Sequence, residues 1–132
     1  MIQRSMWLGG AALWLTACGA PAVGQAWLET EQDTYAPGAE IELRLSNKSF
    51  QYLGYNLCAS RAQRHEEDGT WTDVKFPGAY CTAHLAHMPP GASETYRNTH
   101  SRELEVGEYR YVTRVDWSGE REEVVSNPFR IQ

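Results

Sequence analysis

The chain has 132 residues and a formal net charge of −5 at pH 7, and 42% of its residues are hydrophobic, 22% charged and 11% aromatic. This length allows one domain, and the apolar and aromatic content excludes a wholly disordered chain and a collagen-like fibre. The acidic balance, without a cluster of lysines and arginines, argues against a protein that binds nucleic acid.

The N-terminus has the pattern of an export signal. Arg4 is the only charge in the first 28 residues, and it precedes an apolar stretch over residues 6–15 that is shorter than a membrane span of roughly 20 residues. The stretch runs into LTAC at residues 15–18, which resembles a bacterial lipobox. We therefore expect residues 1–17 to be a cleaved signal peptide and Cys18 to receive the lipid. An ordinary secretory signal and a single membrane anchor are the alternatives.

Residues 18–25 are predicted to form the lipidated cysteine and a flexible tether, because they are small, include glycine and proline, and show no burial pattern. The lipid would make the membrane the first partner of the chain. By resemblance to envelope lipoproteins, Gly19 stands where inner-membrane retention in enterobacteria uses an aspartate. We therefore expect a cell-envelope location, at the outer membrane if the cell is Gram-negative.

The three cysteines agree with export. Lipidation of Cys18 leaves Cys58 and Cys81 as an even pair in an oxidising compartment. We predict a disulfide between them. Closing a loop of this span would stabilise the fold by roughly 3 kcal/mol in the chain-entropy model.

The first half of the domain, which we place at residues 26–132, alternates apolar and polar residues with the period of strands rather than of helices. A first strand over 26–31 would turn Ala26 and Leu28 inward, and a second over 40–46 would bury Ile41, Leu43 and Leu45. The third predicted strand, 51–59, carries Leu53, Tyr55 and Leu57 on one face and Cys58 on the other.

The second half is predicted to begin with a hairpin at Asp68-Gly69, joining 60–65 to 70–75 and burying Trp71 and Val74. An irregular stretch from Pro77 to Gly91 follows. Three further strands are expected at 93–99, 107–116 and 122–131. The last would place Val125, Phe129 and Ile131 on one face, with Pro128 marking an edge or a bulge because proline cannot donate to a ladder.

About seven short strands with regular turn signals favour an all-β fold, a two-sheet antiparallel β-sandwich, over a small closed barrel. The order of motifs adds a resemblance. Residues 35–38 (YAPG), 55–58 (YNLC), 68–71 (DGTW), 107–110 (GEYR) and 127–129 (NPF) together resemble bacterial immunoglobulin-like domains of small envelope lipoproteins.

This resemblance implies an Ig-like sandwich without a catalytic constellation. Gly107-x-Tyr109 resembles the tyrosine corner of Ig-like folds, in which a tyrosine hydroxyl bonds back to upstream backbone. Neither Cys58 nor Cys81 lies on that late strand, so the inter-sheet disulfide of antibody domains is not expected. A looser similarity links the chain to small β-sandwich proteinase inhibitors, for which the loop from Pro77 to Pro90 would be the inhibitory segment.

A metal site is an alternative interpretation of that loop. Its Cys81, His84, His87 and Met88 combine sulfur and imidazole, which suit copper or zinc. A cysteine in a disulfide cannot ligate as a thiolate, however, and exposed histidines are ordinary in a surface loop. We therefore expect no cofactor, and keep His84, His87 and Met88 as the alternative ligand set.

The candidate binding residue is Trp117, which lies beside the Ser118-Gly119 turn, where an indole would form an exposed anchor. Arg110, Arg114 and Arg121 alternate with glutamates near the same turn, and we expect them to form cross-strand pairs on a solvated face.

No motif for a catalytic serine, a nucleophilic cysteine or a metalloprotease is present, so we do not expect an enzyme. The sequence predicts a lipid-anchored envelope lipoprotein with one Ig-like domain, a non-enzymatic binding or structural module. Its partner would be an envelope protein or glycan, and not a nucleic acid. A periplasmic metal-binding protein and a β-sandwich proteinase inhibitor are the alternatives.

Overall fold

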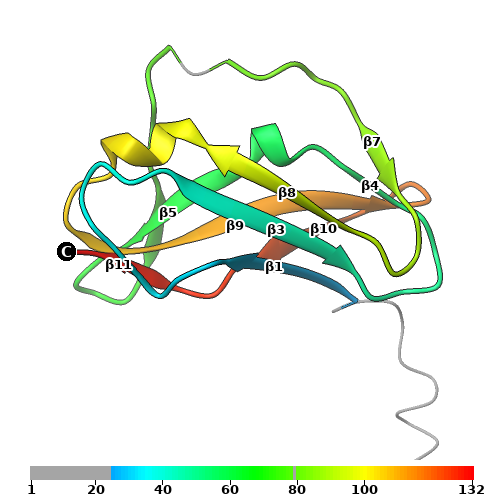
Figure 1. Ribbon diagram of the computed structural model, residues 1–132, viewed down its shortest axis with the longest axis horizontal. Helices are drawn as coiled ribbons and strands as arrows, with labels where there is room; N and C mark the ends of the chain where they lie inside the picture. The colour runs from blue at the N-terminus through cyan, green and yellow to red at the C-terminus, as the bar shows by residue number, and fades with distance from the viewer. Residues whose placement is uncertain (1–24, 79) are drawn as a thin grey trace, which may run out of the picture.

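The computed structural model describes residues 25–78 and 80–132, so the predicted signal peptide and Cys18 lie outside the described residues. The described chain consists of strands and two short 3-10 helices, η1 (Leu57–Ala59) and η2 (Thr99–Glu103). None of the described helices has the length and apolar character that crossing a membrane requires. The strands form two sheets that pack face to face (Figure 1).

The smaller sheet has three antiparallel strands in the order β1-β3-β8, namely β1 (Ala26–Thr30), β3 (Ile41–Asn47) and β8 (Ser93–Asn98). The predicted alternation is confirmed here. Ala26 and Leu28 of β1 are buried, and so are Ile41, Leu43 and Leu45 of β3, while the residues between them, Trp27, Glu42 and Arg44, face outward. Apolar residues at every second position thus determine which face of this sheet packs on the core.

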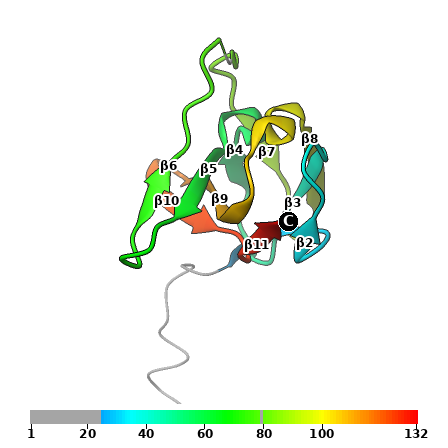
Figure 2. The ribbon, with the colours of Figure 1, turned by 90° about the vertical axis from the view of Figure 1, so that its left-hand side faces the viewer.

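The larger sheet is built around β9 (Gly107–Trp117), the longest strand. On one edge of β9 lie β10 (Glu120–Val125) and β11 (Phe129–Ile131); on the other lie β5 (Arg61–His65) and β4 (Leu53–Tyr55). Three outer strands complete the sheet: β6 (Trp71–Asp73) beside β5, β7 (Ala86–Met88) beside β4, and β2 (Thr34–Tyr35) parallel to β11. Figure 2 shows this sheet from the side, with the loop between β6 and β7 projecting beyond it.

Aromatic rings fill the space between the two sheets. Phe129 stacks on Tyr109 and Tyr111, with ring centroids 6.0 and 5.6 Å apart, and meets Tyr35 edge-on at 5.8 Å. These rings pack within one cluster that also contains the buried aliphatic residues of β3. The chain is therefore an all-β, two-sheet sandwich with one hydrophobic core, as predicted.

Two local predictions are confirmed. The Tyr109 hydroxyl donates a 2.8 Å hydrogen bond to the carbonyl of Glu105, which is the arrangement of a tyrosine corner. Cys58 and Cys81 form a disulfide, with 5.8 Å between their Cα atoms. This disulfide joins η1 to the loop that precedes β7.

The third predicted strand is shorter than expected. It ends at Tyr55, and η1 follows, so Leu57 reaches the core from a helical turn rather than from a strand. Within the stretch from Pro77 to Gly91, which we expected to be irregular, β7 forms because its backbone pairs with β4.

The last predicted strand is divided at Pro128. Val125 pairs with Val112 and Phe129 with Tyr109, so four steps on the returning chain match three steps on β9. The extra residue is a bulge, one of the two features that Pro128 predicted. It also shifts the alternation by one position. Val124, not Val125, is therefore buried with Phe129 and Ile131, and the predicted inward position of Val125 is wrong.

The prediction that Trp71 and Val74 are buried is also wrong, because both are only half-buried. Trp71 lies on the large sheet between two polar side chains. Its ring stacks on the imidazole of His65 at 4.6 Å, and the Arg110 guanidinium lies 4.3 Å from its centroid. Trp71 therefore packs between two polar side chains at the surface of the sheet and does not fill the core.

Candidate functional site

The predicted binding residue, Trp117, is not an exposed anchor. Its side chain is only 9% exposed, and its indole Nε1–H donates a 3.0 Å hydrogen bond to Glu122 Oε1. Trp117 is the last residue of β9, on the phase that also turns Thr113 and Val115 inward. The alternation of β9 thus carries Trp117 into the interior, although the next residues form an exposed turn.

The alternative metal ligands do not come together. His87 and Met88 are consecutive residues of β7, so they point to opposite faces; His87 is exposed and Met88 is buried. His84 is exposed in the preceding loop, and Cys81 is in the disulfide. Among residues 25–78 and 80–132, no three His, Cys, Asp or Glu side chains form a group that could hold a metal ion. The structure therefore gives no support to the metal-binding alternative.

The loop expected for a proteinase inhibitor is exposed and is held to the domain at two points. Besides the disulfide, the Asn56 side-chain amide donates a 2.8 Å hydrogen bond to the Thr82 carbonyl. The His84 N–H donates to the same Thr82 carbonyl at 2.9 Å, so the loop turns tightly here. An inhibitory segment is expected to be extended, and this turn disfavours the inhibitor hypothesis.

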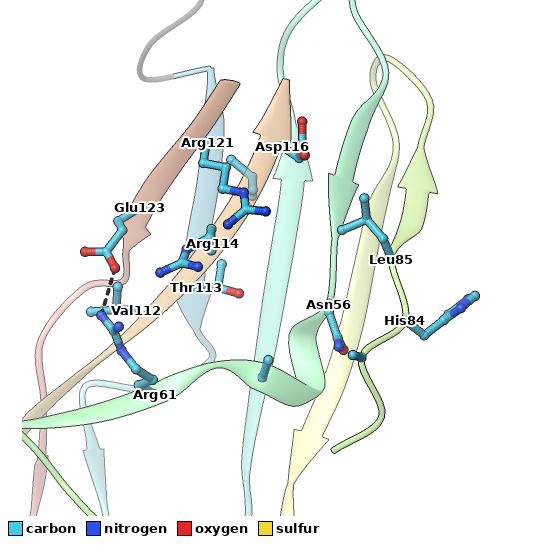
Figure 3. A pocket seen from close by; sticks show the side chains of 13 residues that line it. Asn56, Arg61, His84, Leu85, Val112, Thr113, Arg114, Asp116, Arg121 and Glu123 are labelled. Atoms are coloured by element: carbon cyan, nitrogen blue, oxygen red, sulfur yellow. Dashed lines mark hydrogen bonds and ion pairs between the residues drawn. The ribbon is translucent and has the colours of Figure 1, made fainter. Parts of the chain in front are cut away.

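The strongest candidate site is a groove on the outer face of the large sheet, with a cavity of about 470 Å³. Its floor is formed by the outward residues of β9, among them Val112, Arg114 and Asp116. One wall is β10 and the other is η1 with the Cys81–Leu85 segment. Figure 3 shows Arg61 and Glu123 on one side of this groove and Leu85 on the other.

The wall formed by η1 and the Cys81–Leu85 segment is held in place partly by the close approach of Leu85 to β4. A Cβ atom on Gly54 would lie 2.8 Å from Leu85 Cδ2, so the absence of a side chain at Gly54 lets Leu85 pack directly over the strand. Together with the disulfide and the Asn56–Thr82 hydrogen bond, this contact keeps Leu85 beside the groove.

Three arginines line the groove, and two of them have no partner among the described residues. Arg61 Nη2 donates to Glu123 Oε2 at 3.0 Å. Arg114 lies opposite Glu123 in the ladder and Arg121 opposite Asp116, yet neither makes a hydrogen bond or an ion pair with a residue in the described part of the chain.

The carboxylates that could pair with these arginines are already engaged. Glu123 is held by Arg61, and Asp116 Oδ1 accepts a 2.7 Å hydrogen bond from the Gly119 N–H in the following turn. The predicted cross-strand pairs of Arg114 and Arg121 with glutamates are therefore wrong. Figure 3 shows both guanidinium groups in the middle of the groove.

The groove can thus bind an anion. A guanidinium presents several N–H donors in one plane, which fit a carboxylate or a phosphate with two parallel hydrogen bonds. The lining residues Arg61, Arg114 and Arg121 carry three positive charges against the negative charges of Asp116 and Glu123, whereas the whole chain has a net charge of −5. Sequence reasoning missed this site because the pairing of each arginine depends on which strands are neighbours.

The sequence matches a family described as "Bacterial Ig-like domain" over residues 23–130. Comparison with curated proteins gives no match. Among solved structures, the structural genomics target SoR45 aligns with a TM-score of 0.46 and 15% identity, covering 80% of this chain and 81% of that one.

Two other structures align at similar levels. The alkylpurine DNA glycosylase AlkC of Pseudomonas fluorescens has a TM-score of 0.41 and 16% identity, covering 89% of this chain and 33% of that one. A PapD-like domain of human CEP192 has a TM-score of 0.38 and 11% identity, covering 86% and 89%.

Proposed function

The chain belongs to the bacterial Ig-like domain family, and on this premise we propose that it is a lipid-anchored envelope lipoprotein that acts as a non-enzymatic binding module. The LTAC sequence at residues 15–18 supports the anchor, and the short tether that follows supports a domain held close to a membrane. Domains of this family are generally non-catalytic, which supports binding rather than turnover.

The observation that carries the binding function is the pair of unpartnered arginines in the groove. We infer that Arg114 and Arg121 hold an acidic group, a carboxylate on an envelope partner, while Val112 provides apolar contact below it. Without Arg4, which leaves with the predicted signal peptide, the net charge becomes −6. A mostly acidic surface repels an acidic partner elsewhere and so directs it to the groove.

Intact mass spectrometry of the protein extracted from its own membranes tests the anchor. The expected species begins at Cys18, carries acyl chains, and gains two hydrogens when it is reduced. A species that keeps residues 1–17, or one that lacks acyl chains, would contradict the lipid anchor.

Calorimetric titration of the mature protein with a hexaglutamate peptide tests the groove. Replacing Arg114 and Arg121 together by alanine should weaken binding by about tenfold or more, since each removes a charge-assisted contact. Replacing Arg44 and Arg97 together by alanine is the matched control, because both are exposed arginines on the outer face of the other sheet and the net charge changes equally. Equal losses in both variants would show that general charge, and not the groove, attracts the peptide.

A further inference from the structure

Exposed aromatic side chains gather at the end of the sandwich where the tether joins the domain. Phe50 is 100% exposed, Tyr52 62% and Trp27 55%. Phe50 and Tyr52 belong to the loop between β3 and β4, and Trp27 is the second residue of β1. We call these three residues the aromatic end. Figure 1 shows this loop beside the start of β1, at the opposite end of the molecule from the C-terminus.

A backbone hydrogen bond places this loop directly at the tether. The Lys48 N–H donates to the carbonyl of Gln25 at 2.7 Å, and Gln25 is the first described residue. The Lys48 ammonium lies 5.6 Å from the centroid of the Trp27 ring. The loop that carries Phe50 and Tyr52 is therefore bonded to the chain where the tether enters the domain.

A buried polar network holds the loop in one conformation. The Asn47 side-chain amide donates to the carbonyls of Gln51 at 2.8 Å and of Met88 and Pro89 at 3.2 Å. Its Oδ1 accepts hydrogen bonds from the Ser49 N–H at 3.0 Å and the Ser49 hydroxyl at 2.7 Å. Buried and fully satisfied networks of this kind impose a defined backbone. Phe50 is therefore displayed by an ordered loop.

We propose that the aromatic end inserts into the surface of the same bilayer that holds the lipid on Cys18, an inference that rests on the proposed lipid anchor. Six residues lie between Cys18 and Gln25, so the fully extended tether makes seven Cα-to-Cα steps and spans at most about 25 Å. Gln25, to which the loop is bonded through Lys48, is thus always within that distance of Cys18, and this confinement raises the effective concentration of the aromatic end at the bilayer.

The chemistry of the aromatic end fits a lipid surface. Tryptophan and tyrosine concentrate at the level of lipid headgroups, where one part of each ring is apolar and the other polar. Phe50 supplies a wholly apolar tip for the acyl boundary, and Lys48 supplies a cation for headgroup phosphates. The lipid on Cys18 fixes only the position of the N-terminus, and a second membrane contact would fix the orientation of the domain.

In this orientation β9 begins at the end of the domain that lies farthest from the bilayer. Its first residue, Gly107, and the neighbouring Val106 lie at the far end, separated from Trp117 by about 33 Å of strand. Val106 is 63% exposed, so it is an apolar surface residue that the bilayer does not reach. Val106 is therefore the matched control position for Phe50.

The test uses the acylated mature protein, with acylation verified by intact mass, in vesicles of phosphatidylethanolamine and phosphatidylglycerol with brominated acyl chains. The reporters are Phe50→Trp and the control Val106→Trp, each measured against the unsubstituted protein. Bromine quenches only fluorophores that reach the acyl chains. We expect about a twofold loss of the added fluorescence for Phe50→Trp and none for Val106→Trp.

Equal quenching of the two reporters, or none at position 50, in an acylated protein would overturn the insertion and leave the lipid anchor standing. A mature protein without acyl chains would instead overturn the anchor. If position 50 is protected both from bromine and from aqueous iodide, the aromatic end contacts protein and not lipid, which also overturns the proposal.

Discussion

The hydroxyl of Tyr109 donates a 2.8 Å hydrogen bond to the carbonyl of Glu105, four residues upstream. Tyr109 is almost fully buried, and its ring stacks on Phe129 of the neighbouring strand. One side chain therefore closes the turn that leads into β9 and also contributes to the core between the two sheets.

Replacing Tyr109 by phenylalanine keeps the ring and removes only this hydrogen bond. The Glu105 carbonyl loses its partner, and we expect the free energy of unfolding to fall by about 1 to 3 kcal/mol. Urea denaturation followed by tryptophan fluorescence measures the change. Tyr52→Phe is the control, because the Tyr52 side chain is exposed. A Tyr109→Phe variant as stable as the control would show that the hydrogen bond contributes nothing.

The Cys58–Cys81 disulfide stabilises the domain and also positions one wall of the groove. Replacing both cysteines by alanine should lower the free energy of unfolding by roughly 3 kcal/mol, because the unfolded chain loses a cross-link. It should also weaken hexaglutamate binding, since the Cys81–Leu85 segment is no longer tied to η1. Thermal unfolding and calorimetry measure the two effects. Unchanged peptide binding would show that this wall is not part of the site.

The stability of the domain should fall at alkaline pH. Burial raises the pKa of the Tyr109 hydroxyl and also that of Tyr111 above the ordinary value near 10. The unfolded chain then loses these protons first, so the stabilisation is complete below pH 10 and is lost as the pH rises further. Urea denaturation between pH 8 and 11.5 should show a steep decline above about pH 10. In Tyr111→Phe the decline should be shallower, and an identical slope would contradict this assignment.

The side chain of Asn47 is expected to be indispensable for the loop that carries Phe50. Asn47→Ala leaves the Ser49 N–H and the buried carbonyl of Met88 without their partner, so we expect a loss of about 3 kcal/mol in the free energy of unfolding. Gln51→Ala is the control, since only the backbone of Gln51 takes part in this network. A loss below about 1 kcal/mol for Asn47→Ala would mean that the network is dispensable.

Removing an acid from the groove should strengthen anion binding. In Glu123→Gln the Arg61 guanidinium no longer faces a charged partner at 3.0 Å, and we expect hexaglutamate to bind several-fold more tightly. The stability should change by less than about 1 kcal/mol, because the pair is largely exposed. Glu120→Gln changes the net charge equally on the same strand but does not line the groove. An equal gain in both variants would contradict a local effect.

Much of the fold could be predicted from local patterns. The alternation of β3 was predicted correctly, because Ile41, Leu43 and Leu45 on one face are apolar, whereas Glu42 and Arg44 on the other are charged. The Asp68-Gly69 hairpin was also correct, since Gly69 has a φ of +90°, which glycine adopts without strain. The inward residues of the last strand were predicted in part only. The extra residue before Phe129 reverses the alternation, and the pattern of apolar residues does not show where this bulge lies.

The candidate site residues also divide into those that the sequence could predict and those that it could not. Three cysteines and a predicted export signal were enough to pair Cys58 with Cys81, because cysteine counting needs no coordinates. The burial of Trp117 follows from the alternation of β9, which continues one residue beyond the predicted strand 107–116. The unpaired state of Arg114 and Arg121 was not predictable, since it depends on neighbours that lie on other strands. Arg114 is the direct cross-strand neighbour of Glu123. The ion pair of Glu123 is nevertheless made with Arg61, which β5 brings from the opposite edge of β9.

The sequence by itself therefore determined the all-β class and the disulfide pair, because both follow from residue types and their order along the chain. The lipid anchor stays a prediction. The tertiary structure alone decided the rest. It divided the returning strand at Pro128, bonded the backbone of Lys48 to that of Gln25, and brought three arginines from three strands to two acids. These outcomes depend on contacts between residues distant in the chain, and such contacts form only when the two sheets pack.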